Sequence, residues 1–340
     1  MTRPDMERII ISRTDAIGDV ILTLPMARLI KNHFGEQTEV IFLGKTYTEP
    51  IIKSCPAVDT FLNYDRFLNL NKKDQVIYLK NTRADAIVHV FPRSDIARAA
   101  RKAGFRFRIG TSHRLFHWTT CNKLVNLGRR NSSLHEAQLN IQLLKPLGIN
   151  ADVSLEALGD LIQLENTHEL PRRFASLLRK DMFKLILHPR SHSSAREWKL
   201  QHFQDLIRFL PSEKFQVIIT GGEKEAPELV EWTKSFSSDI VNLAGLLTLN
   251  ELLALIASCD GIVAASTGPL HMAAAMGKHA LGIYPPIRPM HPGRWAPIGT
   301  KAQVLSVKKN CSDCRSNPAA CHCMQDVTPA MVERVILGWV

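Results

Sequence analysis

The regular alternation of short apolar segments with amphipathic segments constrains the fold of this 340-residue chain more than any other feature. The apolar segments are rich in β-branched residues, and the segments between them have helical spacing. This alternation is typical of parallel sheets that are covered by helices on both faces. The predicted strands occupy residues 8–12, 38–43, 85–90 and about 107–109 in the first half, and 184–188, 215–220, 239–244, 260–265, 279–284 and 302–307 in the second half.

A polar, leucine-rich segment over about residues 159–181 separates the two series of strands. The chain length fits about two domains, and the predicted fold class is α/β with two doubly wound, Rossmann-like parallel-sheet domains facing a central cleft. We place the first domain at 1–165, the second at 166–325, and a C-terminal helix at 326–340 that packs back on the first domain. Because ligands bind at the carboxyl ends of parallel strands, the cleft is the expected active site.

Composition is that of an ordinary globular protein, with 45% hydrophobic and 22% charged residues. No apolar run approaches the roughly 18 to 20 residues that span a bilayer, and the N-terminal residues lack the apolar block of a signal peptide. We therefore expect a cytoplasmic protein.

The net charge of +11 is concentrated in one block of the chain. Nine Lys or Arg residues, and no Asp or Glu, lie between Arg98 and Arg130. Such a block attracts nucleic acid, anionic lipid headgroups or a phosphorylated acceptor. A solvated basic surface without any ligand is the alternative.

The first predicted strand leads into a loop that contains Gly18 and Asp19, followed by a helix. Asp19 stands at or near the start of this helix, where its carboxylate could act in chemistry or could simply cap the helix. Pro25 fits the first turn of a helix capped by Thr23 better than the interior of a helix capped by Asp19.

Three later strand ends carry residues suited to contact a phosphate or a nucleotide hydroxyl. Hydroxyl groups and an arginine follow residues 184–188, and two glycines and acidic residues follow 215–220. A Ser-Thr-Gly-Pro sequence after 260–265 opens a helix, with Pro269 at its first position, and a helix start binds anions. Structural turns and polar loops are the alternatives. The residues predicted to contact a phosphate or a nucleotide are Ser191, Ser193, Arg196, Glu225, Ser266, Thr267, Gly268 and His271.

Together these motifs resemble the heptosyltransferase family of lipopolysaccharide biosynthesis, whose members share the GT-B fold and an inverting mechanism. The resemblance covers nearly the whole chain. It is strongest in RTDAIGDVILTLP (residues 13–25) and in the segment from LAGLLTLNELL to HMAAAMG (residues 243–277).

The resemblance implies that Asp19 is the catalytic base, that Arg196 contacts the donor phosphates and that Glu225 contacts the nucleoside. Thr267, Gly268 and His271 would hold the donor diphosphate. Expected partners are a nucleotide-sugar donor, with ADP-heptose favoured, and a lipid-linked or lipopolysaccharide-core acceptor. No metal or cofactor and no nucleic acid is expected, and a basic face would suit peripheral contact with the inner membrane.

The acceptor is expected to meet Arg93 and Arg114 in the first domain, where guanidinium groups can pair with carboxylates or phosphates. Ser266 departs from the family, because members that use ADP-heptose often have Asp at this place. The donor sugar and base therefore stay open.

Cys311, Cys314, Cys321 and Cys323, with His322, form a cysteine-rich stretch like one that many relatives carry. Zinc binding, a labile disulfide and reduced thiols are the alternatives.

Two other functional classes compete with a transferase. An NAD-dependent oxidoreductase would need a glycine fingerprint after the first strand, and residues 12–19 contain a single glycine. A non-catalytic protein that binds sugar nucleotides or polyanions would show donor binding without turnover.

Overall fold

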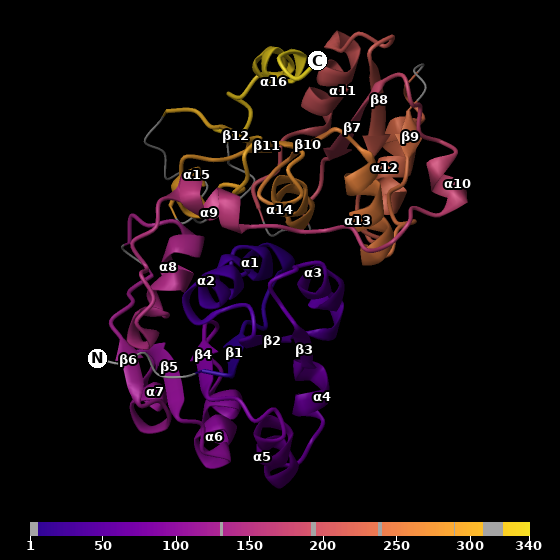
Figure 1. The fold of residues 1–340 in the computed structure, drawn as a ribbon. Coiled ribbons are helices and arrows are strands. Elements are labelled where there is room, and N and C mark those ends of the chain that lie inside the picture. Colours follow the sequence, from indigo (N-terminus) through magenta and orange to yellow (C-terminus); the bar gives the residue numbers. More distant parts are fainter. Residues whose placement is uncertain (1–5, 130–131, 192–194, 237–239, 289, 309–321) are drawn as a thin grey trace. The chain divides into compact units, whose positions relative to one another are not determined.

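The computed structural model describes residues 6–340, except for 130–131, 192–194, 237–239, 289 and 309–321. The chain forms two compact units, Met1–Glu165 and Asn166–Val340. Each unit is an α/β structure built on one parallel sheet (Figure 1). This confirms the predicted fold class of two doubly wound sheets.

The sheet of the first unit has the strand order β3-β2-β1-β4-β5-β6, and every pair is parallel. The strands are β1 (Arg8–Ser12), β2 (Glu39–Gly44), β3 (Thr60–Asn63), β4 (Ala86–His89), β5 (Phe107–Thr111) and β6 (Lys123–Val125). The helices are α1 (Ile17–Ile21), α2 (Pro25–Phe34), α3 (Glu49–Lys53), α4 (Tyr64–Leu68), α5 (Lys72–Lys80), α6 (Ser94–Ala103), α7 (Leu115–Thr120), α8 (Glu136–Gln142) and α9 (Leu155–Leu161), with 3-10 turns η1 (Thr46–Thr48) and η2 (Lys145–Leu147).

The sheet of the second unit has the strand order β12-β11-β10-β7-β8-β9, again with parallel pairs throughout. The strands are β7 (Phe183–His188), β8 (Phe215–Ile219), β9 (Val241–Asn242), β10 (Gly261–Ala264), β11 (His279–Ile283) and β12 (Ala302–Leu305). The helices are α10 (Arg172–Ala175), α11 (Leu200–Phe209), α12 (Ala226–Thr233), α13 (Leu249–Ser258), α14 (Gly268–Ala275), α15 (Pro292–Trp295) and α16 (Pro329–Leu337).

Both sheets reverse their winding direction once, and the reversal point lies beside a central strand. In the first unit the chain passes from β1 outward to β3 and returns to β4 on the other side of β1. In the second unit it passes from β7 outward to β9 and returns to β10. Ligands of doubly wound sheets bind at the carboxyl ends of the strands at such a point. The topology therefore selects the loops after β1 and β4, and those after β7 and β10.

The central strands form because their residues are apolar without interruption. Ile9, Ile10 and Ile11 of β1 are fully buried, since helices cover both faces of the sheet. The edge strands β3 and β6, which the sequence pattern did not predict, are short and only partly buried.

The C-terminal helix α16 packs on α11 within the second unit, and its predicted packing on the first domain stays a prediction. Its N-cap is Thr328, as expected, and Pro329 is its first residue. Val332 and Ile336 of α16 are buried in the same core cluster as Phe203 of α11. The reason is the apolar face of α16, which covers the apolar face of α11 and is thereby removed from water.

His89, the last residue of β4, is 1% exposed, and neither of its ring nitrogens has a hydrogen-bond partner among the described residues. Its ring lies 5.5 Å from that of His117, measured between centroids. Burial lowers the pKa of His89 to about 3. The unfolded chain binds a proton near pH 6.5 and the folded chain does not, so stability decreases as the pH falls below about 6.5.

We predict that His89→Leu reduces the acid sensitivity of folding. Between pH 7 and pH 5, the buried imidazole should cost the wild type about 2 kcal/mol of unfolding free energy that the variant does not lose. Urea unfolding at the two pH values measures the difference. His168→Leu, which changes an exposed histidine, should behave as the wild type does. Equal losses in the wild type and in His89→Leu would contradict the prediction.

Candidate functional site

Asp19 lies at the carboxyl edge of the first sheet, in the first turn of α1. The N-cap of this helix is Ala16, which makes no side-chain cap bond, and Asp19 is the third helical residue. The alternative of a plain N-cap aspartate is therefore wrong. The side chain of Asp19 is 20% exposed and accepts a hydrogen bond from Nη2 of Arg13. Its carboxylate is thus held in a fixed orientation while it keeps access to solvent.

The next helix, α2, has Pro25 in its first turn as predicted, but it begins at Pro25 and its N-cap is Leu24, not Thr23. The Thr23 hydroxyl donates instead to the carbonyl oxygen of Asp19, at 2.8 Å. This hydrogen bond therefore stabilises the short helix α1.

Arg13, the residue directly after β1, organises the surroundings of Asp19. Its side chain is 4% exposed. Nε donates to Oδ1 of Asp15 at 2.6 Å, and Nη1 donates to Oε1 of Glu136 and to Oδ1 of Asn140, each at 3.2 Å. One buried guanidinium therefore connects the loop after β1 to α8.

The α8 side of this network returns to the Asp19 helix. Nδ2 of Asn140 donates to the carbonyl oxygen of Leu22 and to the hydroxyl of Thr23, each at 3.1 Å. Glu136 is 1% exposed and also accepts from Arg129. The buried carboxylate thus has two cationic partners, as a buried charge requires.

The pKa of Asp19 is raised above its ordinary value. Burial is the largest cause, the charge and hydrogen bond of Arg13 oppose it, and the nearby charge of Asp15 adds to the increase. A carboxylate with a raised pKa is a stronger base, and general-base catalysis favours a pKa nearer the working pH.

Tyr47 of η1 is a neighbour of this carboxylate that the sequence pattern did not indicate. Its hydroxyl donates to the carbonyl oxygen of Asp15 at 2.6 Å, and 48% of the residue is exposed. Burial, followed by the charges of Asp15 and Asp19, raises the pKa of Tyr47. An exposed aromatic ring beside a carboxylate offers a surface on which a sugar ring can pack.

In the second unit, β10 leads into α14 through Ser266 and Thr267. Thr267 is the N-cap of α14 and is 6% exposed, and its hydroxyl has no hydrogen-bond partner among the described residues. Gly268 is the first helical residue, so Pro269 stands second and not first as predicted. His271 is buried in the first turn. The unpaired backbone N–H groups of a helix start and its dipole suit an anion here.

The loop after β7 is braced by acidic side chains. The hydroxyl and backbone N–H of Ser191 both donate to Oε1 of Glu197 at 2.8 Å, while Arg190 pairs with Glu197 and Glu228. Ser191 therefore uses its hydroxyl, the group expected to contact the donor, to stabilise the loop. Arg196 lies half-buried in the same loop. The predicted Ser193 lies outside the described residues.

Glu225 is the N-cap of α12, and its Oε2 accepts from the backbone N–H of Gly222 at 2.7 Å. This bond fixes the carboxylate beside the glycine pair that follows β8. Because β10, β7 and β8 are neighbours in the sheet, the loops that carry Ser266, Arg196 and Glu225 emerge along one edge of the second unit.

The two arginines predicted for the acceptor lie on successive loops of the first unit. Arg93 is the N-cap of α6, and its guanidinium lies 5.1 Å from the ring centroid of Tyr64. Arg114 is the N-cap of α7 and is exposed. Both follow strands whose carboxyl ends share the edge with β1.

Comparison with known proteins identifies the family. The sequence profile described as glycosyltransferase family 9 (heptosyltransferase) matches residues 121–325, more than half of the chain. The chain belongs to glycosyltransferase family 9.

Curated relatives and solved structures agree with this assignment. A putative glycosyltransferase of Haemophilus influenzae is 26% identical over 86% of this chain and 86% of its own length. The lipopolysaccharide core heptosyltransferase OpsX of the same organism is 24% identical over 87% of this chain and 83% of its own length. The family 9 glycosyl transferase of Veillonella parvula has a TM-score of 0.81 at 16% identity, covering 99% of this chain and 98% of the other. The Escherichia coli ADP-heptose heptosyltransferase II has a TM-score of 0.74 at 19% identity, with 98% of both chains covered.

The cysteine-rich stretch of this family 9 protein falls almost entirely outside the described residues, which include neither Cys311, Cys314 nor Cys321. Cys323 is buried in the core of the second unit. Within the described ranges, no group of three or more His, Cys, Asp or Glu side chains is arranged to hold a metal ion. In the same ranges, no helix is long and apolar enough to cross a membrane.

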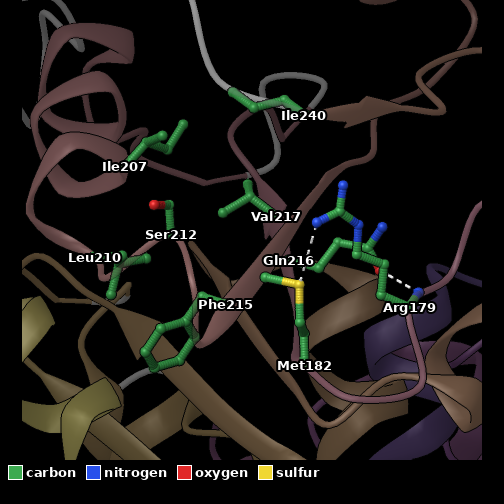
Figure 2. A pocket seen from close by; sticks show the side chains of 9 residues that line it. All are labelled: Arg179, Met182, Ile207, Leu210, Ser212, Phe215, Gln216, Val217 and Ile240. Carbon is green, nitrogen blue, oxygen red and sulfur yellow. Dashed lines mark hydrogen bonds between the residues drawn. The ribbon is translucent and has the colours of Figure 1, made fainter.

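Figure 2 shows a small pocket in the second unit, near the amino ends of the strands and not at their carboxyl ends. Met182 and Phe215, which line it, lie at the amino ends of β7 and β8, and Arg179 lies beside them with Nη1 3.6 Å from Sδ of Met182. The pocket is therefore separate from the strand ends that carry the predicted donor residues.

We predict that Arg13→Ala destabilises the protein by about 3 to 5 kcal/mol, because it removes a cationic partner of buried Glu136. Urea unfolding measures the loss. The matched control is Arg28→Ala, which breaks a surface pair with Glu36 and should cost less than about 1 kcal/mol. Equal effects of the two substitutions would show that the Arg13 network does not hold the first unit together.

Proposed function

We propose that this protein is an inverting glycosyltransferase that moves a sugar, with heptose favoured, from an ADP-sugar or related nucleotide diphosphate donor onto a lipopolysaccharide-core or similar glycan acceptor. The observation that carries the proposal is the Asp19 carboxylate, which a buried arginine orients at the reversal point of the first sheet. Solved relatives support the donor: E. coli WaaC has been determined with ADP-2-deoxy-2-fluoro heptose, with a TM-score of 0.68 to this chain at 15% identity.

In the proposed reaction an acceptor hydroxyl oxygen attacks the anomeric carbon while the bond from that carbon to the diphosphate oxygen breaks. Asp19 takes the hydroxyl proton, and direct displacement inverts the anomeric centre. Arg93 and Arg114 bind acidic groups of the acceptor, because guanidinium groups pair well with carboxylates and phosphates.

The second unit would hold the donor and stabilise the leaving group. The start of α14, with Ser266, Thr267, Gly268 and His271, and the nearby Arg196 offer positive potential to the diphosphate. We propose that these groups replace a metal ion. Glu225 would accept a hydrogen bond from a nucleoside hydroxyl, while Ser191 and Ser193 would offer hydroxyl groups to the donor phosphates.

We also propose that the protein works in the cytoplasm at the inner membrane, because its proposed acceptor is lipid-linked. A non-catalytic binder of sugar nucleotides is the alternative function. It differs in one respect that an experiment can measure, since it binds the donor without releasing ADP in the presence of any acceptor.

We predict that Asp19→Asn lowers kcat by about 10²- to 10⁴-fold, the usual contribution of a general base, and leaves donor affinity unchanged. ADP release measures turnover, and calorimetry measures donor binding. Because the pKa of Asp19 is raised and the base must be unprotonated, wild-type kcat/KM should rise with pH through a midpoint above the ordinary carboxyl value of about 3.9.

The control for this experiment is Asp15→Asn, which neutralises another carboxylate on the same guanidinium. It should keep kcat within about tenfold of the wild type, well short of the loss of a general base. A variant Asp19→Asn that keeps more than a tenth of the wild-type rate would exclude Asp19 as the base.

We predict that nucleotide sugars of only one class, with ADP-sugars favoured, raise the thermal unfolding midpoint of the protein. The reason is that a ligand stabilises the folded state that binds it. The increase should be smaller in Arg196→Ala. Arg208→Ala removes an exposed arginine on α11 and should respond as the wild type does. A chain that ADP-, UDP-, GDP- and CMP-sugars all leave unshifted would have no donor site.

A further inference from the structure

We propose that α7 and the cations around it form a docking surface for an anionic lipid bilayer, with Leu115 and Trp118 inserted among the headgroups. This surface, the α7 face, consists of α7 and the exposed cations Arg98, Lys102, Arg106, Arg114 and Lys123. The expectation of membrane contact thereby acquires a definite surface and a definite anchor.

The outward side of α7 carries two large apolar side chains, which is unusual for a surface helix. Leu115 is 89% exposed and Trp118 is 64% exposed, whereas His117 and Thr120 are buried. Residues three apart lie on the same side of a helix, so the two large apolar side chains are neighbours. Exposed apolar groups that gather in this way mark an interaction site.

Trp118 is suited to an interface between water and lipid. Its indole Nε1 donates to the carbonyl oxygen of Ser112 at 2.9 Å, so the polar atom of the ring is satisfied within the protein. The exposed remainder of the side chain is apolar. Tryptophan is enriched at headgroup depth for this combination of properties.

Exposed cations lie on the elements next to α7. Helix α6, which carries Arg98 and Lys102, is joined to α7 by a bond from Arg101 Nη1 to the carbonyl oxygen of Thr119, at 2.6 Å. No Asp or Glu occurs between Asp95 and Glu136 in the sequence.

The two flanking acids are committed elsewhere. Asp95 accepts from the hydroxyl of Tyr64 at 2.8 Å, and Glu136 is buried against Arg13 and Arg129. A helix with apolar side chains on its outer side and Lys and Arg around it matches the chemistry of segments that lie in a membrane interface.

Two arguments favour a bilayer over nucleic acid. One is the apolar pair Leu115 and Trp118, and the other rests on the proposed lipid-linked acceptor. Both polyanions would attract the cations, and the Trp118 ring could stack on a base, but Leu115 offers no ring for stacking, whereas both side chains suit a lipid interface. The position is also suitable. β5, which leads into α7, lies two strands from β1, or about 10 Å along the sheet edge. The headgroups would therefore lie near the edge that carries Asp19.

Vesicle flotation tests the proposal with full-length protein. The wild type should float with vesicles of equal parts phosphatidylglycerol and phosphatidylcholine, and not with pure phosphatidylcholine. The double variant Leu115→Ser/Trp118→Ser should lose at least about tenfold in the partition coefficient, since two largely exposed apolar side chains no longer enter the interface. Arg98→Gln and Lys102→Gln should each lose about fivefold.

The control for lost apolar area is Phe209→Ser, which removes a residue that is 48% exposed in the second unit and should float as the wild type does. The single variant Leu115→Ser tests the same surface with little risk of misfolding, because this side chain is almost entirely exposed. Trp118→Phe should keep most of the binding but abolish a blue shift of fluorescence on vesicle addition, which would place Trp118 itself in the interface.

Flotation of the double variant at the wild-type level would overturn the proposal. So would tight binding of a random oligonucleotide that the Arg98 and Lys102 variants weaken and the double variant does not. An ADP-release assay with a water-soluble acceptor separates this inference from the proposed function. The double variant should retain its rate in this assay. A wild type that floats with vesicles but shows no turnover would contradict the proposed transferase function and would still support the docking surface.

Discussion

The first unit depends on one buried cation, the guanidinium of Arg13. It lies directly after a fully buried strand and binds Asp15, Asp19 and Glu136 together. Removing these charges from water costs several kcal/mol each, so the arrangement persists only because each group has a partner of opposite charge. A lysine could not replace this arginine, since a single ammonium cannot present the planar set of donors that three carboxylates occupy.

The same network has two opposite effects on the pKa of Asp19. Burial raises the pKa of its carboxyl, while Arg13 limits the increase. The second unit offers the complementary electrostatics, because the start of α14 and Arg196 favour negative charge. Each arrangement occurs where its sheet reverses direction, between β1 and β4 or between β7 and β10. One topology, used twice, therefore accounts for both halves of the proposed chemistry.

The sequence was sufficient to predict the central strands and the loops that follow them, because buried parallel strands are continuously apolar. It did not indicate β3 or β6, whose residues are few and half-buried. It led to the prediction of Asp19 but did not indicate that Arg13 binds this residue, since Arg13 meets Glu136 across 123 positions of the chain. The four-residue spacing of Glu136 and Asn140 on α8 was a signal that could have been noticed. Ser191 was predicted as a site residue, but its hydrogen bond to Glu197 became evident only in the folded loop.

The basic block shows why counting charges along a sequence cannot locate a binding surface. Several of its arginines are used internally: Arg129 pairs with Glu136, Arg101 caps a carbonyl of α7, and Arg108 donates to the carbonyl oxygen of Thr120. The exposed remainder lies on α6, on β6 and next to α7, the helix with two exposed apolar side chains that no charge count would include. Charge supplies the long-range attraction to a polyanion, and the neighbouring apolar groups determine which polyanion is retained. Lipid is the partner to test because exposed cations and apolar side chains occur together on neighbouring elements of one unit. The net charge of the chain alone would not indicate it.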